Sequence, residues 1–130
     1  MTFRLTIGGD IAPTPSNFEL FANGDAQILI GDELLNLFRS SDGIFLNLET
    51  PLVDIPSPIE KNGPNLIAPS SSIVGLAAID SYCYGLANNH IMDQGIEGLI
   101  STVGLLDQAG ISHVGAGNNL SEAFKPFFQF

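Results

Sequence analysis

Short apolar segments typical of β-strands alternate along this chain with segments whose apolar residues recur at helical spacing. The strand-like segments are residues 3–8, 43–48, 66–68, 82–87 and 112–114, and residues 127–130 resemble the start of another. Helical spacing is found in residues 26–38, 70–79, 96–106 and 119–124. Strands joined through helices form right-handed crossovers. This order therefore predicts a layered α/β fold with a mostly parallel sheet and helices on both faces.

Glycine, proline and serine residues set the expected ends of these elements. Gly31 weakens the helix predicted for residues 26–38, and Gly110 is suited to end the helix that precedes it. The hydroxyl groups of residues 70–72, three consecutive serines, can cap the helix that follows them. Residues 50–64 contain four prolines. We expect this segment to be a loop on the protein surface.

Length and charge limit the kinds of protein that this chain can be. Its 130 residues are enough for a single domain, which we expect to span residues 1–130. Fourteen acidic and four basic residues give a net charge of −10, which argues against binding to nucleic acid or to an anionic membrane surface but permits binding of cations. The sequence contains neither a signal peptide nor a run long enough to cross a bilayer. On this basis we expect a cytoplasmic protein without a membrane segment.

Polar residues that can bind a metal ion follow three of the expected strands. Parallel sheets place ligands beyond the carboxyl ends of their strands, because loops converge there. Carboxylate, carboxamide and imidazole groups are ligands for Mg²⁺, Mn²⁺, Fe and Zn²⁺. Each of these residues can equally be a turn former or a helix-terminal residue. The residues concerned are Asp10, Asn47, Glu49, Asn88, Asn89 and His90.

The order of these motifs resembles the bacterial capsule-synthesis CapA family, also called the poly-gamma-glutamate biosynthesis proteins. The resemblance covers nearly the whole chain, and Lys61 also falls where this family tends to carry a lysine. Members of that family are often anchored to the membrane or exported. The strings that carry the resemblance are Gly8-Gly9-Asp10, Asn47-Leu48-Glu49, Ala87-Asn88-Asn89-His90-Ile91-Met92-Asp93-Gln94-Gly95 and Gly115-Ala116-Gly117-Asn118.

The family is similar to the calcineurin-like metallophosphoesterases, whose fold is a two-sheet α/β sandwich with a dinuclear metal site at the strand ends. The resemblance implies one or two divalent ions (Mn, Mg, Fe or Zn), with Asp10, Glu49 and Asn89 as ligands. It also implies that His90 faces the substrate as a catalytic residue. Asp93 can either hold His90 for catalysis or cap the following helix, and capping is the preferred interpretation.

Two departures from the metallophosphoesterase pattern limit this comparison. Ala12 stands where that pattern has a histidine. The remaining ligands of the pattern are histidines from a second half of the domain, whereas this chain has only His90 and His113, and His113 is expected to be structural. The resemblance therefore implies that this chain cannot complete a dinuclear site alone, and that it is the N-terminal half of a longer protein. Its apolar end, residues 124–130, is expected to promote self-association when exposed.

Three interpretations of function remain open from the sequence. The first is a metal-dependent hydrolase of the metallophosphoesterase type that acts on a phosphate ester or an anionic polymer in capsule or poly-gamma-glutamate biosynthesis. The second is a non-catalytic assembly or polymer-binding component of the same system. The third is an α/β fragment whose polar strand ends serve only as turns.

Overall fold

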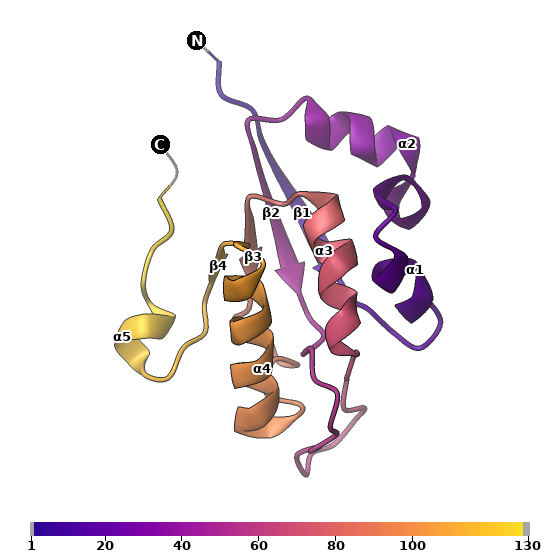
Figure 1. Cartoon of the computed structure of the whole chain (residues 1–130). Helices are drawn as coiled ribbons and strands as arrows, with labels where there is room; N and C mark the ends of the chain where they lie inside the picture. The colour runs from indigo at the N-terminus through magenta and orange to yellow at the C-terminus, as the bar shows by residue number, and fades with distance from the viewer. Residues whose placement is uncertain (1, 129–130) are drawn as a thin grey trace.

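The computed structural model describes residues 2–128 and contains a four-stranded parallel sheet in the order β1-β2-β3-β4 (Figure 1). No helix in this part of the chain is long and apolar enough to cross a membrane. The strands are β1 (Leu5–Ile11), β2 (Gly43–Leu48), β3 (Cys83–Gly85) and β4 (His113–Val114). The helices are α1 (Phe18–Asn23), α2 (Ala26–Arg39), the 3₁₀ turn η1 (Ser70–Ser72), α3 (Ile73–Ile79), α4 (Gly95–Gln108) and α5 (Leu120–Ala123).

The strand order decides which side of the sheet the helices cover. Each strand lies beside the one that precedes it in sequence, so successive right-handed crossovers advance in one direction and place their helices on the same face. Figure 1 shows α3 and α4 in front of the sheet, with α1 and α2 beside α3. The predicted α/β fold with a parallel sheet is confirmed. Within residues 2–128, however, the sheet lacks the second helical layer that was expected on its other face.

The core lies between the sheet and this single helical layer. In β2, residues Ile44, Leu46 and Leu48 are buried, whereas the residues between them are only partly covered. This alternation is the period of two that a strand with one covered face requires. The core residues of β2 pack with a cluster from the helices and β3 that includes Phe21, Phe38, Leu76, Ile79, Tyr84 and Leu106.

The opposite face of the sheet is apolar and exposed at β1. Leu5 and Ile7 alternate with Thr6 along the strand, and their side chains are 55% and 69% exposed. Ile7 pairs in register with Phe45, which lies on the uncovered side of β2. The strand that carries Asp10 therefore also presents hydrophobic side chains to solvent.

Several element ends differ from the sequence prediction. β1 continues through Asp10 to Ile11 instead of stopping at Gly8, with a shift in register between Ile7 and Asp10. The shift lets Asp10 pair with Asn47 in β2. α2 is interrupted at Gly31, whose φ of 76° lies outside the helical region, so the weak point predicted there is a kink.

Other predicted elements are shorter or absent. Residues 66–68 form no strand, only an isolated bridge between Ala68 and Leu52. The serines of η1 accept no capping hydrogen bond from α3, and Ser70 donates to Asp54 instead. Residues 127 and 128 are not in a strand, and residues 129 and 130 lie outside the described part of the chain.

The close approach of α1 and α3 predicts that Gly75→Ala will destabilise the fold. A Cβ at Gly75 would lie 2.7 Å from the Cα of Phe21 and 2.8 Å from its carbonyl oxygen, so backbone would have to move. We expect a loss of about 1–3 kcal/mol in the free energy of unfolding, measured by urea denaturation. Gly104→Ala in α4 is the matched control. A Cβ there meets nothing within 4 Å, so this change should add about 0.5–1 kcal/mol. Equal effects at the two glycines would contradict the packing argument.

The exposed apolar surface predicts that the chain self-associates at high concentration, as expected from the apolar C-terminal residues. Phe124 and Phe128 are 78% and 69% exposed, so two separate surfaces are available. Sedimentation velocity should show a concentration-dependent shift, which Ile7→Lys should reduce if the sheet face is the contact. Ile28→Lys, at a helix residue that is 63% exposed, is the control. A single monomer species at high concentration would contradict this prediction.

Candidate functional site

A chain of polar side chains runs across the carboxyl ends of β1, β2 and β3. The Asn47 amide donates to Oδ1 of Asp10 over 2.8 Å, and the Asn88 amide donates to Oδ1 of Asn47 over 3.1 Å. The Asn88 amide also donates to the Leu48 carbonyl at 2.8 Å. Side chains from three neighbouring strand ends are therefore held together, as parallel strand geometry predicts.

Asn88 also fixes the turn that carries His90. Its Oδ1 accepts from the backbone amides of His90 and Ile91 at 2.9 and 3.0 Å. This is the Asx-type turn that an asparagine after a strand favours. The local turn chemistry of Asn88 thus serves to place the imidazole at the sheet edge.

His90, Asp93 and Lys61 form a second polar cluster beside this turn. Nδ1 of His90 lies 2.7 Å from Oδ2 of Asp93, and the Lys61 ammonium forms an ion pair with Oδ1 of the same carboxylate. The Leu66 amide donates to Oδ2 at 2.7 Å. The Asp93 side chain is completely buried, whereas those of Lys61 and His90 are 20% and 17% exposed.

The preferred interpretation of Asp93 as a helix cap is wrong. The residue that precedes α4 is Gln94, and no side chain makes a capping hydrogen bond there. The carboxylate of Asp93 turns instead toward His90 and Lys61. Because it is fully buried, Asp93 cannot touch a substrate and can act only by positioning these two neighbours.

The surroundings of Asp93 favour its ionised form. Burial alone would raise the pKa of the carboxyl, since a charge is costly away from water. The hydrogen bonds from Lys61, Leu66 and His90, together with the charge of Lys61, outweigh burial and bring the pKa of Asp93 below its ordinary value of 3.8. Asp93 is therefore a carboxylate at neutral pH.

The proline-rich loop between β2 and α3 is anchored to the start of α4. Ser57 donates from its amide to Oε1 of Gln94 at 2.9 Å and from its hydroxyl to the Gln94 carbonyl at 2.6 Å. The Gln94 amide in turn donates to the Leu66 carbonyl at 2.9 Å, and Ile59 donates to the Asp93 carbonyl at 3.0 Å. The loop is not wholly on the surface as predicted, because residues 50–53 are buried.

Glu49 and Asn89 do not join either network. Glu49 is half-buried and Asn89 is exposed, and neither side chain makes a hydrogen bond within the described residues. Residues 2–128 contain no group of three or more His, Cys, Asp or Glu side chains that could hold a metal ion. The strand ends offer side-chain oxygen atoms that can ligate a metal ion. Asn47 orients the carboxylate of Asp10, and the side chains of Glu49 and Asn89 have no hydrogen-bond partner among the described residues. This donor chemistry fits a hard cation but supplies only part of a coordination shell.

Sequence reasoning did not assign a role to Lys61 or Gln94. Both act through long-range contacts that no local pattern encodes. One signal was available for Lys61, because it is the only basic residue between Arg39 and Lys125 and lies in a loop rich in proline. An isolated cation in an acidic chain needs a partner when it is largely buried.

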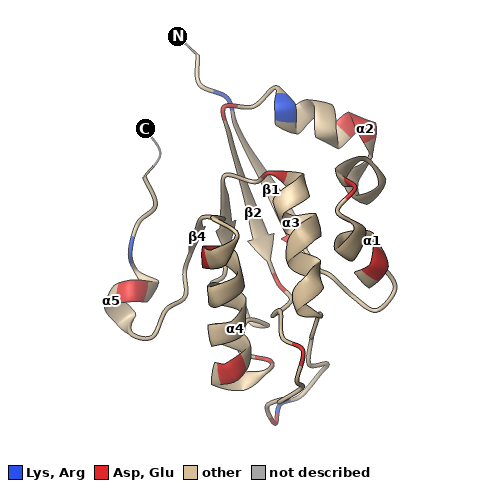
Figure 2. Ribbon diagram, in the orientation of Figure 1, with Lys and Arg blue, Asp and Glu red and all other residues tan. Residues whose placement is uncertain are grey.

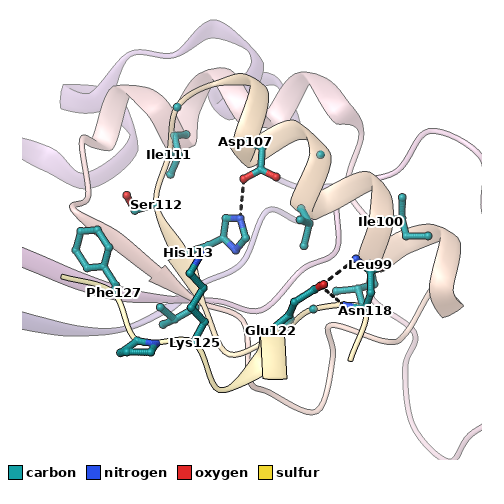
Figure 3. A pocket seen from close by; sticks show the side chains of 17 residues that line it. Leu99, Ile100, Asp107, Ile111, Ser112, His113, Asn118, Glu122, Lys125 and Phe127 are labelled. Carbon is teal, nitrogen blue, oxygen red and sulfur yellow. Dashed lines mark hydrogen bonds and ion pairs between the residues drawn. The ribbon is translucent and has the colours of Figure 1, made fainter. Parts of the chain in front are cut away.

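A groove of about 680 Å³ lies apart from these clusters, between α4, β4 and the segment that contains α5 (Figure 3). Within it, Nε2 of His113 lies 3.0 Å from Oδ1 of Asp107, and the Glu122 carboxylate binds Asn118. His113 pairs with Asp107 of the preceding helix α4, a contact that suits the structural role expected for it. None of the five predicted site residues lines this groove.

The fold and the polar strand ends define a parallel α/β protein with a candidate site at the carboxyl edge of its sheet. The sequence profile of the bacterial capsule synthesis protein family PGA_cap matches residues 4–129. The chain belongs to this family, as its motifs indicated.

Individual relatives agree with this assignment. The chain is 32% identical over 95 residues to the PGA biosynthesis protein CapA of Bacillus subtilis, an alignment that covers 68% of this chain and 24% of that protein. It is 34% identical over 84 residues to a probable polyglutamine synthesis accessory protein of Mycobacterium tuberculosis (65% and 22%). It is also 34% identical over 96 residues to an uncharacterized protein of Sinorhizobium fredii (70% and 21%). The chain thus spans less than a quarter of the length of these relatives.

The buried carboxylate predicts that Asp93→Asn will lower stability in a pH-dependent way. The change removes a charge that accepts from three donors, and we expect a loss of about 2–3 kcal/mol at pH 7. Because the pKa of Asp93 is lowered on folding, its contribution is complete well above 3.8 and disappears as the pH falls through the lower folded value. Urea denaturation at several pH values should therefore show wild type and variant converging below about pH 4.

Asp32→Asn is the control for this experiment, since Asp32 is exposed on α2. It should leave stability almost unchanged at every pH. A constant difference between wild type and Asp93→Asn down to strongly acid pH would contradict the assignment of Asp93 as an ionised, paired group.

Proposed function

We propose that this chain carries part of the active site of a metal-dependent hydrolase that serves capsule or poly-gamma-glutamate biosynthesis. The observation that carries the proposal is the position of His90 at the sheet edge, held by Asn88 through its backbone and by Asp93 through its ring. An imidazole fixed by a buried carboxylate beside polar strand ends is an arrangement suited to proton transfer. If His90 served only to form the turn, its ring would not need the contact with Asp93.

Charge supports the participation of a cation. The basic residues lie at a few separate positions, whereas acidic residues are spread over the ribbon (Figure 2). Lys61 lies near the site, but its charge is already paired with Asp93. An anionic substrate such as a phosphate ester or a polyglutamate would therefore be repelled by Asp10 and Glu49. The cluster of His90, Asp93 and Lys61 has no unpaired lysine to balance that charge.

A divalent ion would remove this repulsion. Asp10, Glu49 and Asn89 are the residues that would hold it, and Asn47 would orient the carboxylate of Asp10. When bound, such an ion polarises a phosphoryl or carbonyl oxygen and lowers the pKa of bound water. Further ligands would have to come from outside residues 2–128, because these oxygens supply only part of a coordination shell.

His90 would then move a proton at Nε2. Nδ1 is engaged with Asp93, and Nε2 makes no hydrogen bond to any described residue and is not enclosed. In its neutral form Nε2 can accept a proton from an attacking water, and in its charged form it can deliver one to a leaving oxygen. Asp93 would position the ring throughout.

A second function is favoured by one observation from the relatives. The Mycobacterium tuberculosis protein is named as an accessory protein of polyglutamine synthesis. On this alternative, the same strand ends bind the anionic polymer through a cation, or position partner proteins, without breaking a bond. Glu49→Gln would still weaken binding through a cation, whereas His90→Gln would leave function intact.

Metal binding and hydrolysis separate these two functions. In a full-length form of the protein, which would supply the remaining ligands, we expect Mn²⁺ to bind, as measured by calorimetry, and Asp10→Asn and Glu49→Gln each to weaken this binding at least tenfold. Glu33→Gln, at an exposed position of α2, is the matched control and should not. With bis-p-nitrophenyl phosphate and with poly-gamma-glutamate as substrates, His90→Gln should lower Mn²⁺-dependent turnover by about 10²–10⁴-fold. Mn²⁺ binding with no turnover of either substrate would favour the accessory function, and no binding would contradict both cation-dependent proposals.

A further inference from the structure

Lys61 occupies a place that the proposed hydrolysis does not by itself explain. It lies in the loop between β2 and α3, far in sequence from the turn that carries His90. Its ammonium nevertheless contacts Oδ1 of Asp93, the carboxylate oxygen that His90 does not contact. The loop is fastened on both sides of it, by Ile59 to the Asp93 carbonyl and by Leu66 to the Asp93 carboxylate. The position of Lys61 is therefore built into the fold.

The contacts of Asp93 determine which ring nitrogen of His90 carries the proton. Nδ1 lies 2.7 Å from Oδ2 of Asp93, a distance at which two bare lone pairs would repel each other. Nδ1 must therefore be the N–H donor, which leaves Nε2 with a free lone pair in the neutral ring. The Lys61 ammonium, 3.5 Å from Nδ1, cannot then donate to the ring, so both groups converge on the carboxylate instead.

We propose that Lys61 is a positioning residue that holds Asp93 so that Asp93 fixes His90 as the Nδ1–H tautomer with Nε2 free. The two carboxylate oxygens divide their partners, since Oδ1 accepts from Lys61 while Oδ2 accepts from His90 and Leu66. Without Lys61, Oδ1 would be a buried anionic oxygen with no donor. The carboxylate would then rotate or recruit water, and His90 would lose its fixed partner. The catalytic meaning of this tautomer rests on the proposed hydrolase function, but the tautomer itself does not.

Lys61 is assigned to positioning rather than to substrate binding because of its surroundings. Its side chain is only 20% exposed, and its charge is neutralised by a carboxylate that is fully buried. A lysine that binds an anionic substrate would instead need a free ammonium facing solvent. In any turnover assay, removal of Lys61 should therefore lower kcat and leave KM nearly unchanged.

The direct test is ¹⁵N NMR of the histidine rings in the intact chain, at about pH 8, where a histidine with an ordinary pKa is neutral. The chain has two histidines, so His113 serves as an internal control. In wild type, we expect the ring nitrogens of His90 to show one fixed tautomer with the proton on Nδ1. In Lys61→Met both signals should move toward the averaged values of a free histidine, and Lys61→Arg should restore them because arginine also donates to a carboxylate. Lys125→Met is the matched control and should change nothing at His90.

The outcomes separate this proposal from the proposed function. An Nε2–H tautomer of His90 in wild type would overturn it, and so would unchanged ring signals in Lys61→Met. Should Lys61→Met fail to fold, Lys61→Ala, which also removes the donor, takes its place with the same two outcomes. Absence of hydrolysis alongside the expected ring signals would overturn the hydrolase function and leave the positioning role of Lys61 standing.

Discussion

The carboxylate of Asp93 is the group on which the arrangement of the site depends. A buried charge is tolerated only when it is paired and its oxygens are hydrogen-bonded. Asp93 meets this requirement with three donors from two segments, namely Lys61 and Leu66 of the loop and His90 of the turn after β3. Ordering a long loop costs roughly 1–2 kcal/mol per residue in backbone entropy, so the loop needs anchors of this strength. The same contacts that satisfy Asp93 therefore fix the loop and orient the imidazole.

The second constraint is the order of the strands. Crossovers of one hand, repeated in one direction, place their helices on one side of the sheet and, within residues 2–128, leave the other side without a helical layer. Asp10 and Asn47 pair across β1 and β2 just beyond the Ile7–Phe45 pair, after the shift in register, so the polar edge adjoins the uncovered apolar face. Whatever covers this face in a longer protein would also border the candidate site. The two-sheet sandwich implied by the resemblance stays an expectation for that longer protein.

Periodicity predicted β2 fully and α4 to within a few residues, because burial on one face repeats every two or every 3.6 residues. It could not predict the extension of β1 to Asp10, since Gly8 and Gly9 are typical of a turn, whereas here Gly8 allows close approach to Leu46. The members of the strand-end site were found because polar residues after strands are visible in sequence. Lys61 and Gln94 were not, because their partners lie 32 and 37 residues away in the sequence and depend on how the loop folds back.

The charge balance of the site bears on which partners it can accept. A net charge of −10 repels anions at long range, and the one lysine at the site is neutralised by Asp93. An anionic polymer can therefore approach this edge only when a cation or another part of a longer protein supplies positive charge. The carboxylates of Asp10, which is exposed, and of Glu49, which is half-buried, favour the first possibility, since they are hard ligands without an internal cation partner. In this family member, binding of the metal and binding of an anionic substrate would then be coupled steps, with the metal required first.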